Sequence, residues 1–320
     1  MAQVQVKTEV LPPARRHKRS FHYIRLLIAT QIFRFTLRLK MWIHPFPSFN
    51  NPNVTREKGI VPSRDAGRNI RIHAYRPTSC PAYEALPVLV NFHGSGFIIP
   101  MLGQDEEWCT RVAEEARMLV IDADYRKAPE YPFPHGAEDA EDVVRHVLNH
   151  VPHTTLSISG MSAGGNIAFG AAAFFGPERV RSIVSFYPST DAATDVATVT
   201  QDPFIPPSVM RHMMACYILP GTPLDDPRVS PGLSRLEDLP KHIWVAAGAN
   251  DPLHVGASAF MARLQREGHP DAVFVSVAGA AHGFDRRHGG VGPGVTPAGR
   301  EIRDEAVAFL KKNSKGPRVA

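Results

Sequence analysis

A chain of 320 residues with a hydrophobic fraction of 43% and a charged fraction of 21% has the composition of a soluble globular protein, which excludes a disordered or fibrous chain. Its three cysteines are widely spaced and form neither a disulfide framework nor a paired metal-ligand motif, so a reducing compartment is expected. The net charge of +5 comes from residues 1–50, which hold nine Lys or Arg and one acid, and this distribution argues against a nucleic-acid-binding domain.

The first predicted element lies within this basic arm, where residues 1–20 are polar and residues 21–43 are apolar with charges interspersed. A spacing of three or four positions along the sequence predicts an amphipathic helix here. Most of the following residues recur at that spacing: Ile24, Leu27, Ile28, Gln31, Ile32, Phe35 and Leu39. We expect the helix to pack on the body of the protein. Peripheral membrane contact through residues 21–43 stays an alternative, as does a mitochondrial transit peptide.

The same segment is too interrupted by charges to cross a membrane. Its longest uncharged stretch, 26–33, is far shorter than the roughly 20 apolar residues that a membrane span requires. No A-x-A cleavage pattern follows it, so a signal peptide is not expected. We therefore expect a cytoplasmic protein, with membrane-peripheral location as the alternative.

Beyond the arm, apolar strand-like runs alternate with helix-like segments. Strands are predicted at Arg71–Tyr75, Pro87–Phe92, Met118–Asp122, Thr155–Ser159, Val180–Tyr187, His242–Ala247 and Ala272–Val277. Helices are predicted at 105–117, 137–150, 166–175, 255–267 and 297–312. Most of these strands are continuously apolar, which is typical of a parallel sheet covered on both faces. The expected fold is α/β, with a doubly wound, mostly parallel central sheet and a mainly helical cap.

Residues 191–240 interrupt this alternation, because they are rich in Pro, Asp and Met and show only one helical fragment, at 207–217. A long segment of this kind usually has a function, and here it predicts a lid over the strand ends. We therefore predict a basic arm and cap helix at 1–55, a core formed by 56–190 and 241–320, and a cap insertion at 191–240.

A Gly-x-Ser-x-Gly sequence at residues 160–164 follows the predicted strand 155–159 and precedes a predicted helix. In a tight turn from strand to helix, glycines are needed because there is no room for side chains, and the central serine is held in a strained conformation that exposes its hydroxyl. Ser162 is therefore the candidate nucleophile for acyl transfer.

A loop with the sequence His93-Gly94-Ser95-Gly96-Phe97 follows the predicted strand 87–92. Small residues let backbone N–H groups approach a developing negative charge, so the expected oxyanion donors are Ser95 and Gly96, joined by Ala163 after the nucleophile. His93 lies at the base of this loop. We expect it to support the loop rather than to act as a base.

His282 is the expected base, because it lies in a small-residue loop after the last predicted strand. Asp251 follows the strand 242–247 and is the expected acid, with Asp271 and Asp285 as rivals that do not follow a strand end. The chain order Ser162, Asp251, His282 is that of the α/β-hydrolase arrangement.

These motifs resemble those of the hormone-sensitive-lipase-like, or fold-3, branch of the α/β hydrolases. The family's oxyanion loop resembles residues 93–97, and its Gly-Asp-Ser-Ala-Gly-Gly-Asn elbow resembles residues 160–166. Its Asp-Tyr-Arg-x-Ala-Pro-Glu-x-Pro-Phe-Pro segment is similar to residues 124–134. Its Asp-Pro-Leu and His-Gly-Phe motifs match residues 251–253 and 282–284. The resemblance covers roughly residues 60–312. It implies a cap built from N-terminal helices and an insertion. Neither a metal nor another cofactor is expected.

The chain departs from the family pattern at three places. Ser95 replaces a glycine of the oxyanion loop, where its side chain would narrow the site or add a hydroxyl. Because the N–H donor survives, we expect altered selectivity rather than lost activity. Met161 replaces the usual acidic residue before the nucleophile, which removes a charge near the histidine. His254-Val255-Gly256 replaces the polar, acidic run that often follows the Asp-Pro-Leu motif.

The predicted function is that of a serine hydrolase that cleaves carboxylic esters with a Ser-His-Asp triad through an acyl-enzyme. The expected substrates are small-molecule esters with small to medium acyl groups, or natural-product esters. Two alternatives stay open: a lactonase or dehydratase-type enzyme of secondary metabolism on the same scaffold, and a non-catalytic ligand receptor. The sequence does not indicate an oligomeric state.

Overall fold

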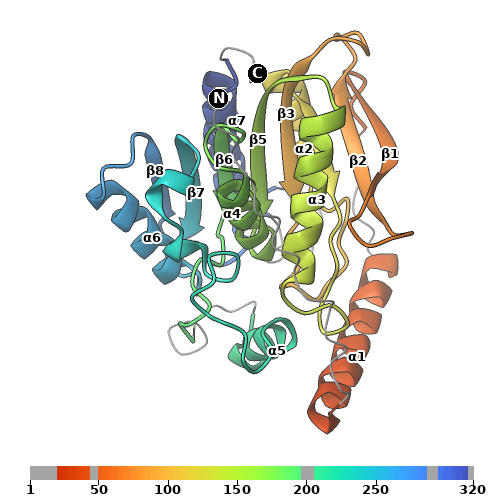
Figure 1. Ribbon diagram of the computed structural model, residues 1–320, viewed down its shortest axis with the longest axis vertical. Helices are drawn as coiled ribbons and strands as arrows, with labels where there is room; N and C mark the ends of the chain where they lie inside the picture. Colours follow the sequence, from red (N-terminus) through yellow and green to blue (C-terminus); the bar gives the residue numbers. More distant parts are fainter. Residues whose placement is uncertain (1–19, 44–49, 196–204, 287–294, 316–320) are drawn as a thin grey trace, which may run out of the picture.

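The computed structural model describes residues 20–43, 50–195, 205–286 and 295–315. Within them, an eight-stranded sheet forms the centre of the molecule (Figure 1). In sheet order, its strands are β1 (Val54–Pro62), β2 (Asn69–Pro77), β4 (Leu119–Ala123), β3 (Leu86–Phe92), β5 (His153–Met161), β6 (Ser182–Phe186), β7 (His242–Gly248) and β8 (Ala272–Val277). The β1–β2 and β2–β4 pairs are antiparallel, whereas the others are parallel. This sheet confirms the predicted fold class.

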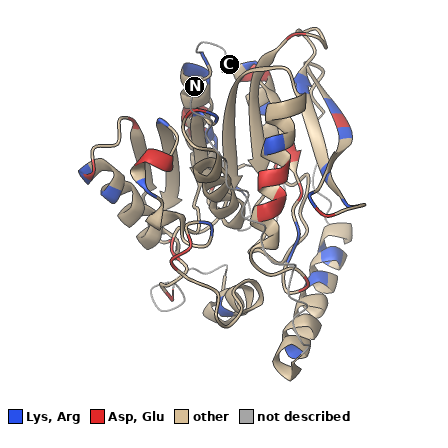
Figure 2. Ribbon diagram, in the orientation of Figure 1, with Lys and Arg blue, Asp and Glu red and all other residues tan. Residues whose placement is uncertain are grey.

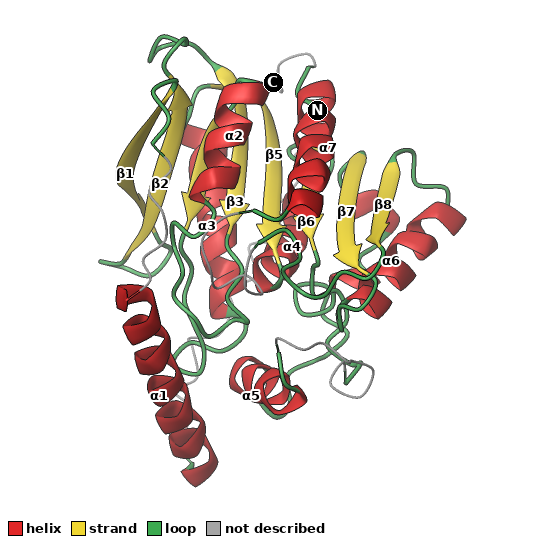
Figure 3. Cartoon of the chain, turned by 180° about the vertical axis from the view of Figure 1, so that it is seen from behind, coloured by secondary structure: helices red, strands yellow, loops and turns green. Residues whose placement is uncertain are grey.

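Helices cover both faces of the sheet. The helices are α1 (Phe21–Ile43), α2 (Glu106–Ala116), α3 (His135–His150), α4 (Ala163–Phe175), α5 (Pro207–Tyr217), α6 (His254–Arg266) and α7 (Pro297–Asn313). Helices α2 and α7 pack together on one face, and α3, α4 and α6 lie on the other (Figures 1 and 3). Strands β3, β5 and β6 are almost wholly buried between these layers, which explains why their sequences are continuously apolar or small.

Every strand and helix predicted from the sequence is present, with ends that differ by a few residues. Strand β1 was missed. It lies at the edge of the sheet and is mostly exposed, so its sequence Val-Thr-Arg-Glu-Lys-Gly-Ile-Val-Pro lacks an apolar run. An edge strand of this kind is fixed by its pairing with β2 rather than by burial of its own side chains.

Helices α1 and α5 lie beyond the carboxyl ends of the parallel strands, where a cap would cover the site (Figure 3). The described part of the predicted insertion 191–240 contains α5 and two short 3₁₀ turns, Pro231–Leu233 and Leu236–Asp238. The predicted division of the chain into arm, core and cap insertion agrees with this placement and stays a prediction.

Helix α1 packs on the body as expected, but not through its periodic apolar residues. The predicted apolar face does not pack on the body, because Ile24, Ile28, Ile32, Phe35 and Leu39 are all exposed. The opposite side of the helix is the buried one, and its most buried residues are polar, Thr30 and Arg34. These make specific hydrogen bonds to the body, which periodicity alone could not reveal. In the described part of the chain, none of the helices combines the length and apolar character of a membrane span.

Candidate active site

Ser162 lies at the junction between β5, which ends at Met161, and α4, which begins at Ala163. Its backbone has φ 56° and ψ −121°, a left-handed conformation that is unfavourable for a residue with a side chain. The turn is tight, because a Cβ atom on Gly164 would overlap the carbonyl oxygens of Phe92 and His93. The structure therefore places Ser162 on the kind of strained elbow that the Gly-x-Ser-x-Gly sequence predicts.

Gly164→Ala is expected to destabilise the protein by about 3 kcal/mol or more, since the added methyl group meets backbone rather than a flexible side chain. Any displacement of the elbow by ~1 Å should also lower kcat by about 100-fold. The matched control is Gly170→Ala in the same helix, where the new Cβ would find ordinary contacts at 3.4 Å or more. Thermal unfolding and ester hydrolysis would be measured for both variants, and equal behaviour would contradict the tight elbow.

Three side chains from distant parts of the chain meet at this elbow. His282 Nε2 lies 3.0 Å from Ser162 Oγ, and His282 Nδ1 lies 2.8 Å from Asp251 Oδ2. Asp251 accepts a second hydrogen bond at Oδ1 from the Leu253 N–H, at 2.8 Å, so its carboxylate is held in place. When Nδ1 donates to Asp251, Nε2 carries the lone pair and can accept a proton from Ser162. The arrangement is suited to activating the serine hydroxyl.

The two rival acids lie in other environments. Asp271 pairs with His242 Nδ1 at 2.7 Å, at the start of β7 and away from the elbow. Asp285 accepts hydrogen bonds from Tyr187 Oη at 2.6 Å and from Arg303 Nη2 at 2.6 Å. The structure thus brings Asp251 to His282 and gives each rival a different partner.

Tyr187 was not singled out from the sequence, although it packs against the imidazole. The rings of Tyr187 and His282 meet edge to face with 4.7 Å between centroids. Burial raises the pKa of Tyr187, so its hydroxyl stays protonated and donates to Asp285. The loop that carries His282 therefore packs against the buried Tyr187 ring, whose hydroxyl has a hydrogen-bond partner in Asp285.

The Ser95 hydroxyl makes hydrogen bonds within the oxyanion loop. Its hydroxyl oxygen lies 2.6 Å from Tyr125 Oη and accepts the Phe97 N–H at 2.9 Å. Since Tyr125 Oη donates to the His93 carbonyl at 2.8 Å, the Ser95 hydroxyl donates to Tyr125. The side chain therefore braces the loop from within. Ser95 also lines the larger cavity, and the altered selectivity expected from its side chain stays a prediction.

His93 is completely buried beneath the loop, with Nδ1 3.0 Å from the Gly94 carbonyl and Nε2 3.4 Å from Asp124 Oδ1. Its ring stacks on Tyr125. Burial lowers the pKa of His93, and the nearby Lys127 ammonium lowers it further. These contacts suit the predicted role of loop support.

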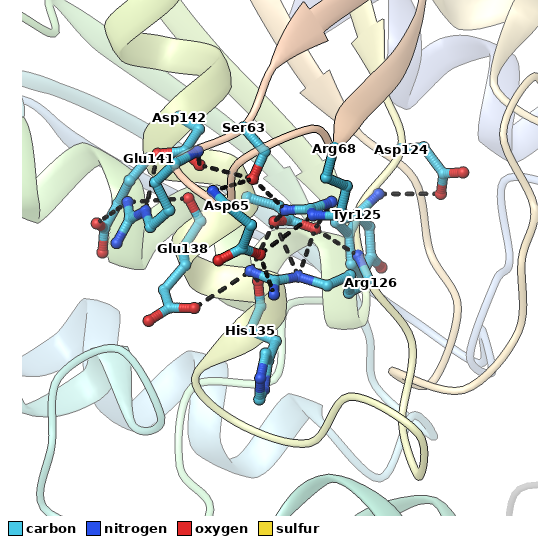
Figure 4. Close-up of polar contacts among 12 residues, drawn as sticks. Ser63, Asp65, Arg68, Asp124, Tyr125, Arg126, His135, Glu138, Glu141 and Asp142 are labelled. Atoms are coloured by element: carbon cyan, nitrogen blue, oxygen red, sulfur yellow. Dashed lines mark hydrogen bonds and ion pairs between the residues drawn. The ribbon is translucent and has the colours of Figure 1, made fainter. Parts of the chain in front are cut away.

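The segment after β4 carries Tyr125 beneath the loop and is tied to two other elements. Arg126 donates to Asp65, which follows β1, at 2.7 Å, and to Asp139 of α3 at 3.0 Å (Figure 4). Arg68 pairs with the same Asp139 carboxylate. Because Asp139 is fully buried, its charge needs these partners. This network explains why the Asp-Tyr-Arg segment holds the oxyanion loop although it lies outside the predicted triad.

A second support reaches the loop from the histidine side and was also missed. Gln104 Nε2 donates to the Gly94 carbonyl at 2.5 Å, and Arg286 Nη1 donates to the Gln104 carbonyl at 3.2 Å. Arg286 also pairs with the buried Asp105 and lies 2.6 Å from Met161 Sδ. Burial alone would raise the pKa of Asp105, but Arg286 holds it below its ordinary value. The loop that carries His282 is thereby connected to the oxyanion loop.

Two cavities flank the candidate nucleophile. The larger has a volume of about 670 Å³ and lies between the oxyanion loop, α1 and the segment leading into α5. The smaller has a volume of about 60 Å³ and extends toward Asp191 and Leu253. Both are lined by Gly96, Ser162, Met213 and His282. Met213 packs over Gly96, whose φ of 51° favours glycine. A ligand at Ser162 can therefore extend in two directions of different size.

The chain is similar to known proteins in sequence and in fold. A family model described as alpha/beta hydrolase fold matches residues 89–286. Esterase LipI of Mycobacterium tuberculosis is 30% identical over 252 residues, which cover 74% of this chain and 76% of that protein. Versiconal hemiacetal acetate esterase stcI of Emericella nidulans is 29% identical over 188 residues, 52% of this chain and 63% of that protein. The hyperthermophilic esterase of Pyrobaculum calidifontis has 25% sequence identity and a TM-score of 0.74, with 92% of each chain covered.

Proposed function

The chain belongs to the α/β-hydrolase family, in its hormone-sensitive-lipase-like branch of carboxylic ester hydrolases, and from this premise we propose that it is a serine esterase with the triad Ser162, His282 and Asp251. The observation that carries the proposal is the continuous chain of contacts from Ser162 Oγ through the imidazole to Asp251, at 3.0 and 2.8 Å. Both distances lie within the range in which a proton can pass between hydrogen-bonded groups.

The proposed reaction proceeds through an acyl-enzyme. Ser162 Oγ attacks the ester carbonyl carbon while His282 Nε2 takes the hydroxyl proton, and the resulting imidazolium then protonates the leaving alcohol. Water next attacks the acyl-enzyme with His282 as base, which releases the acid and restores the serine. Asp251 does not change its protonation state. It orients the imidazole and stabilises its charge through Nδ1.

The negative charge of each tetrahedral intermediate is proposed to form against the N–H groups of Ser95, Gly96 and Ala163. Ala163 is the first residue of α4, and the first N–H groups of a helix have no carbonyl partner within that helix. Tyr125 and Gln104 hold the loop from the His93 and Gly94 carbonyls, so its donors are positioned before substrate binds.

The unequal cavities support a substrate with one small and one larger group. A volume of about 60 Å³ holds only a few non-hydrogen atoms, whereas about 670 Å³ is enough for a medium-sized organic group. We propose small-molecule esters with small to medium acyl groups, natural-product esters included. The name of the Emericella nidulans relative describes an acetate ester of this general kind.

Labelling with a fluorophosphonate tests the proposal. The probe is expected to modify Ser162 alone, identified by mass spectrometry of the labelled peptide, with parallel loss of p-nitrophenyl acetate hydrolysis. Hydrolysis should release acid and alcohol in equal amounts. Stable binding of esters without labelling would support a receptor, whereas release of an unsaturated product without an acid would support an elimination enzyme.

A further inference from the structure

Helix α1 presents a continuous apolar surface to solvent, which we call the α1 stripe. It consists of Phe21, Ile24, Ile28, Ile32, Phe35, Leu39, Trp42 and Ile43. At ~100° per residue, these side chains fall within an arc of about 100° and run the length of the helix. Their exposure reaches 68% at Phe35 and 80% at Trp42. Scattered exposed apolar residues are ordinary, but a contiguous row of eight indicates an interaction surface.

The stripe is held outward by contacts on the opposite side of α1. Arg34 donates to the carbonyl oxygens of Ile98 and Ala128, each at 2.8 Å, and to Glu130 at 2.6 Å. One turn earlier, Thr30 Oγ1 lies 2.9 Å from His212 Nε2 of α5. Rotating the helix to bury the stripe would break these bonds and leave the Ile98 and Ala128 carbonyl oxygens without their donor, at an energetic cost.

The charges around the stripe indicate what can cover it. Helix α1 carries Lys and Arg but no acidic residue (Figure 2). At ~100° per residue, Arg25 and Arg38 flank the stripe on its two sides. The preceding residues 1–20 add five Lys or Arg and one acid. A second copy of this chain would bring two basic surfaces together, and the bases of residues 1–20 would add to the repulsion between them. A surface with anionic groups outside and apolar groups beneath would fit both the flanking bases and the apolar stripe.

We propose that α1 docks the protein on an anionic lipid bilayer, with the α1 stripe inserted at the depth of the lipid headgroups and the bases paired with lipid phosphates or carboxylates. Trp42 suits such an interface because its ring is both apolar and a hydrogen-bond donor. The proposal does not depend on the esterase assignment.

Docking would also place the candidate active site next to the membrane. Phe33, Leu37 and Lys40, which lie on other sides of the same helix, line the larger cavity at Ser162. An apolar ester dissolved in the bilayer would then reach the cavity along α1 without crossing bulk water.

Vesicle flotation of the full chain tests the proposal. We expect binding to vesicles of phosphatidylcholine with roughly 30% phosphatidylserine, and at least about tenfold weaker binding to phosphatidylcholine alone. The triple variant Ile28→Ser, Ile32→Ser, Phe35→Ser should weaken binding to the anionic vesicles by about tenfold or more. The matched control, Ile60→Ser, Tyr83→Ser, Val255→Ser, removes three exposed apolar side chains elsewhere and should bind as the parent does.

Tryptophan fluorescence gives a second reading. Of the three tryptophans, Trp108 and Trp244 are buried, so a blue shift of the emission on adding vesicles would report on Trp42. Trp42→Phe should abolish that shift. Three results would overturn the proposal: no flotation of the parent, equal losses in the two triple variants, or a Trp42 emission already blue-shifted without vesicles. The last would mean that a second copy or residues 1–19 cover the stripe, and light scattering would separate these two occupants.

Discussion

Ser162→Ala is expected to lower kcat for p-nitrophenyl acetate by on the order of 10⁴-fold or more, with little change in the unfolding temperature. In the proposed reaction the hydroxyl oxygen attacks the carbonyl carbon. In the described structure, none of the other side chains that line the cavities is held by a histidine–aspartate pair. A small residual rate should persist, because the oxyanion donors still bind the ester carbonyl.

The control for this variant is Ser258→Ala, which removes a hydroxyl from α6, outside both cavities. Its kcat should stay within about twofold of the parent, as is usual for surface changes away from a site. Steady-state kinetics of the purified variants, with active sites titrated, would decide the matter. Near-parental turnover by Ser162→Ala would exclude the proposed nucleophile.

Asp251→Asn is the second large effect, with an expected loss of about 10⁴-fold in kcat. The side chain is fully buried, and its Oδ1 is already occupied by the Leu253 N–H. An amide there would keep its oxygen toward Leu253 and turn its NH₂ toward His282 Nδ1. The imidazole would then carry its proton on Nε2, where it could not accept the proton of Ser162.

Asp271→Asn is a close control, because Asp271 also pairs with a histidine nitrogen, His242 Nδ1, at a similar distance of 2.7 Å. This pair lies at the start of β7, far along the sheet from the elbow, so its loss should leave kcat within about twofold of the parent. Measuring kcat for both variants separates two effects: a changed tautomer of the His282 imidazole, and the general loss of a contact between an aspartate and a histidine. Equal losses would refute the role of Asp251.

Two departures from the family pattern have structural consequences. Ser95 forms hydrogen bonds with Tyr125 and with the Phe97 N–H, so the extra hydroxyl stiffens the oxyanion loop. Met161 Sδ lies 2.6 Å from the Arg286 guanidinium, and Arg286 pairs with the buried Asp105.

Much of the fold could be predicted because the signals are local. Continuous apolar runs produced the correct parallel strands, whereas the exposed edge strand β1 carries no such run and was missed. The helix at 21–43 was predicted correctly and packs on the body, but its periodic apolar residues do not make this contact. Its periodic apolar residues are exposed, and Arg34 and Thr30 make the anchoring contacts through hydrogen bonds that a hydrophobic pattern does not encode.

By itself, the sequence determined the fold class, the elbow at Ser162 and the order of the three triad candidates. These follow from glycines, strand ends and small residues that act within a few positions of one another. Only the tertiary structure decided how Tyr125, Gln104 and Arg286 brace the oxyanion loop, which partner each aspartate has, and which side of α1 faces solvent. These contacts join residues far apart in the chain, so their geometry exists only after the sheet and its connecting loops are assembled.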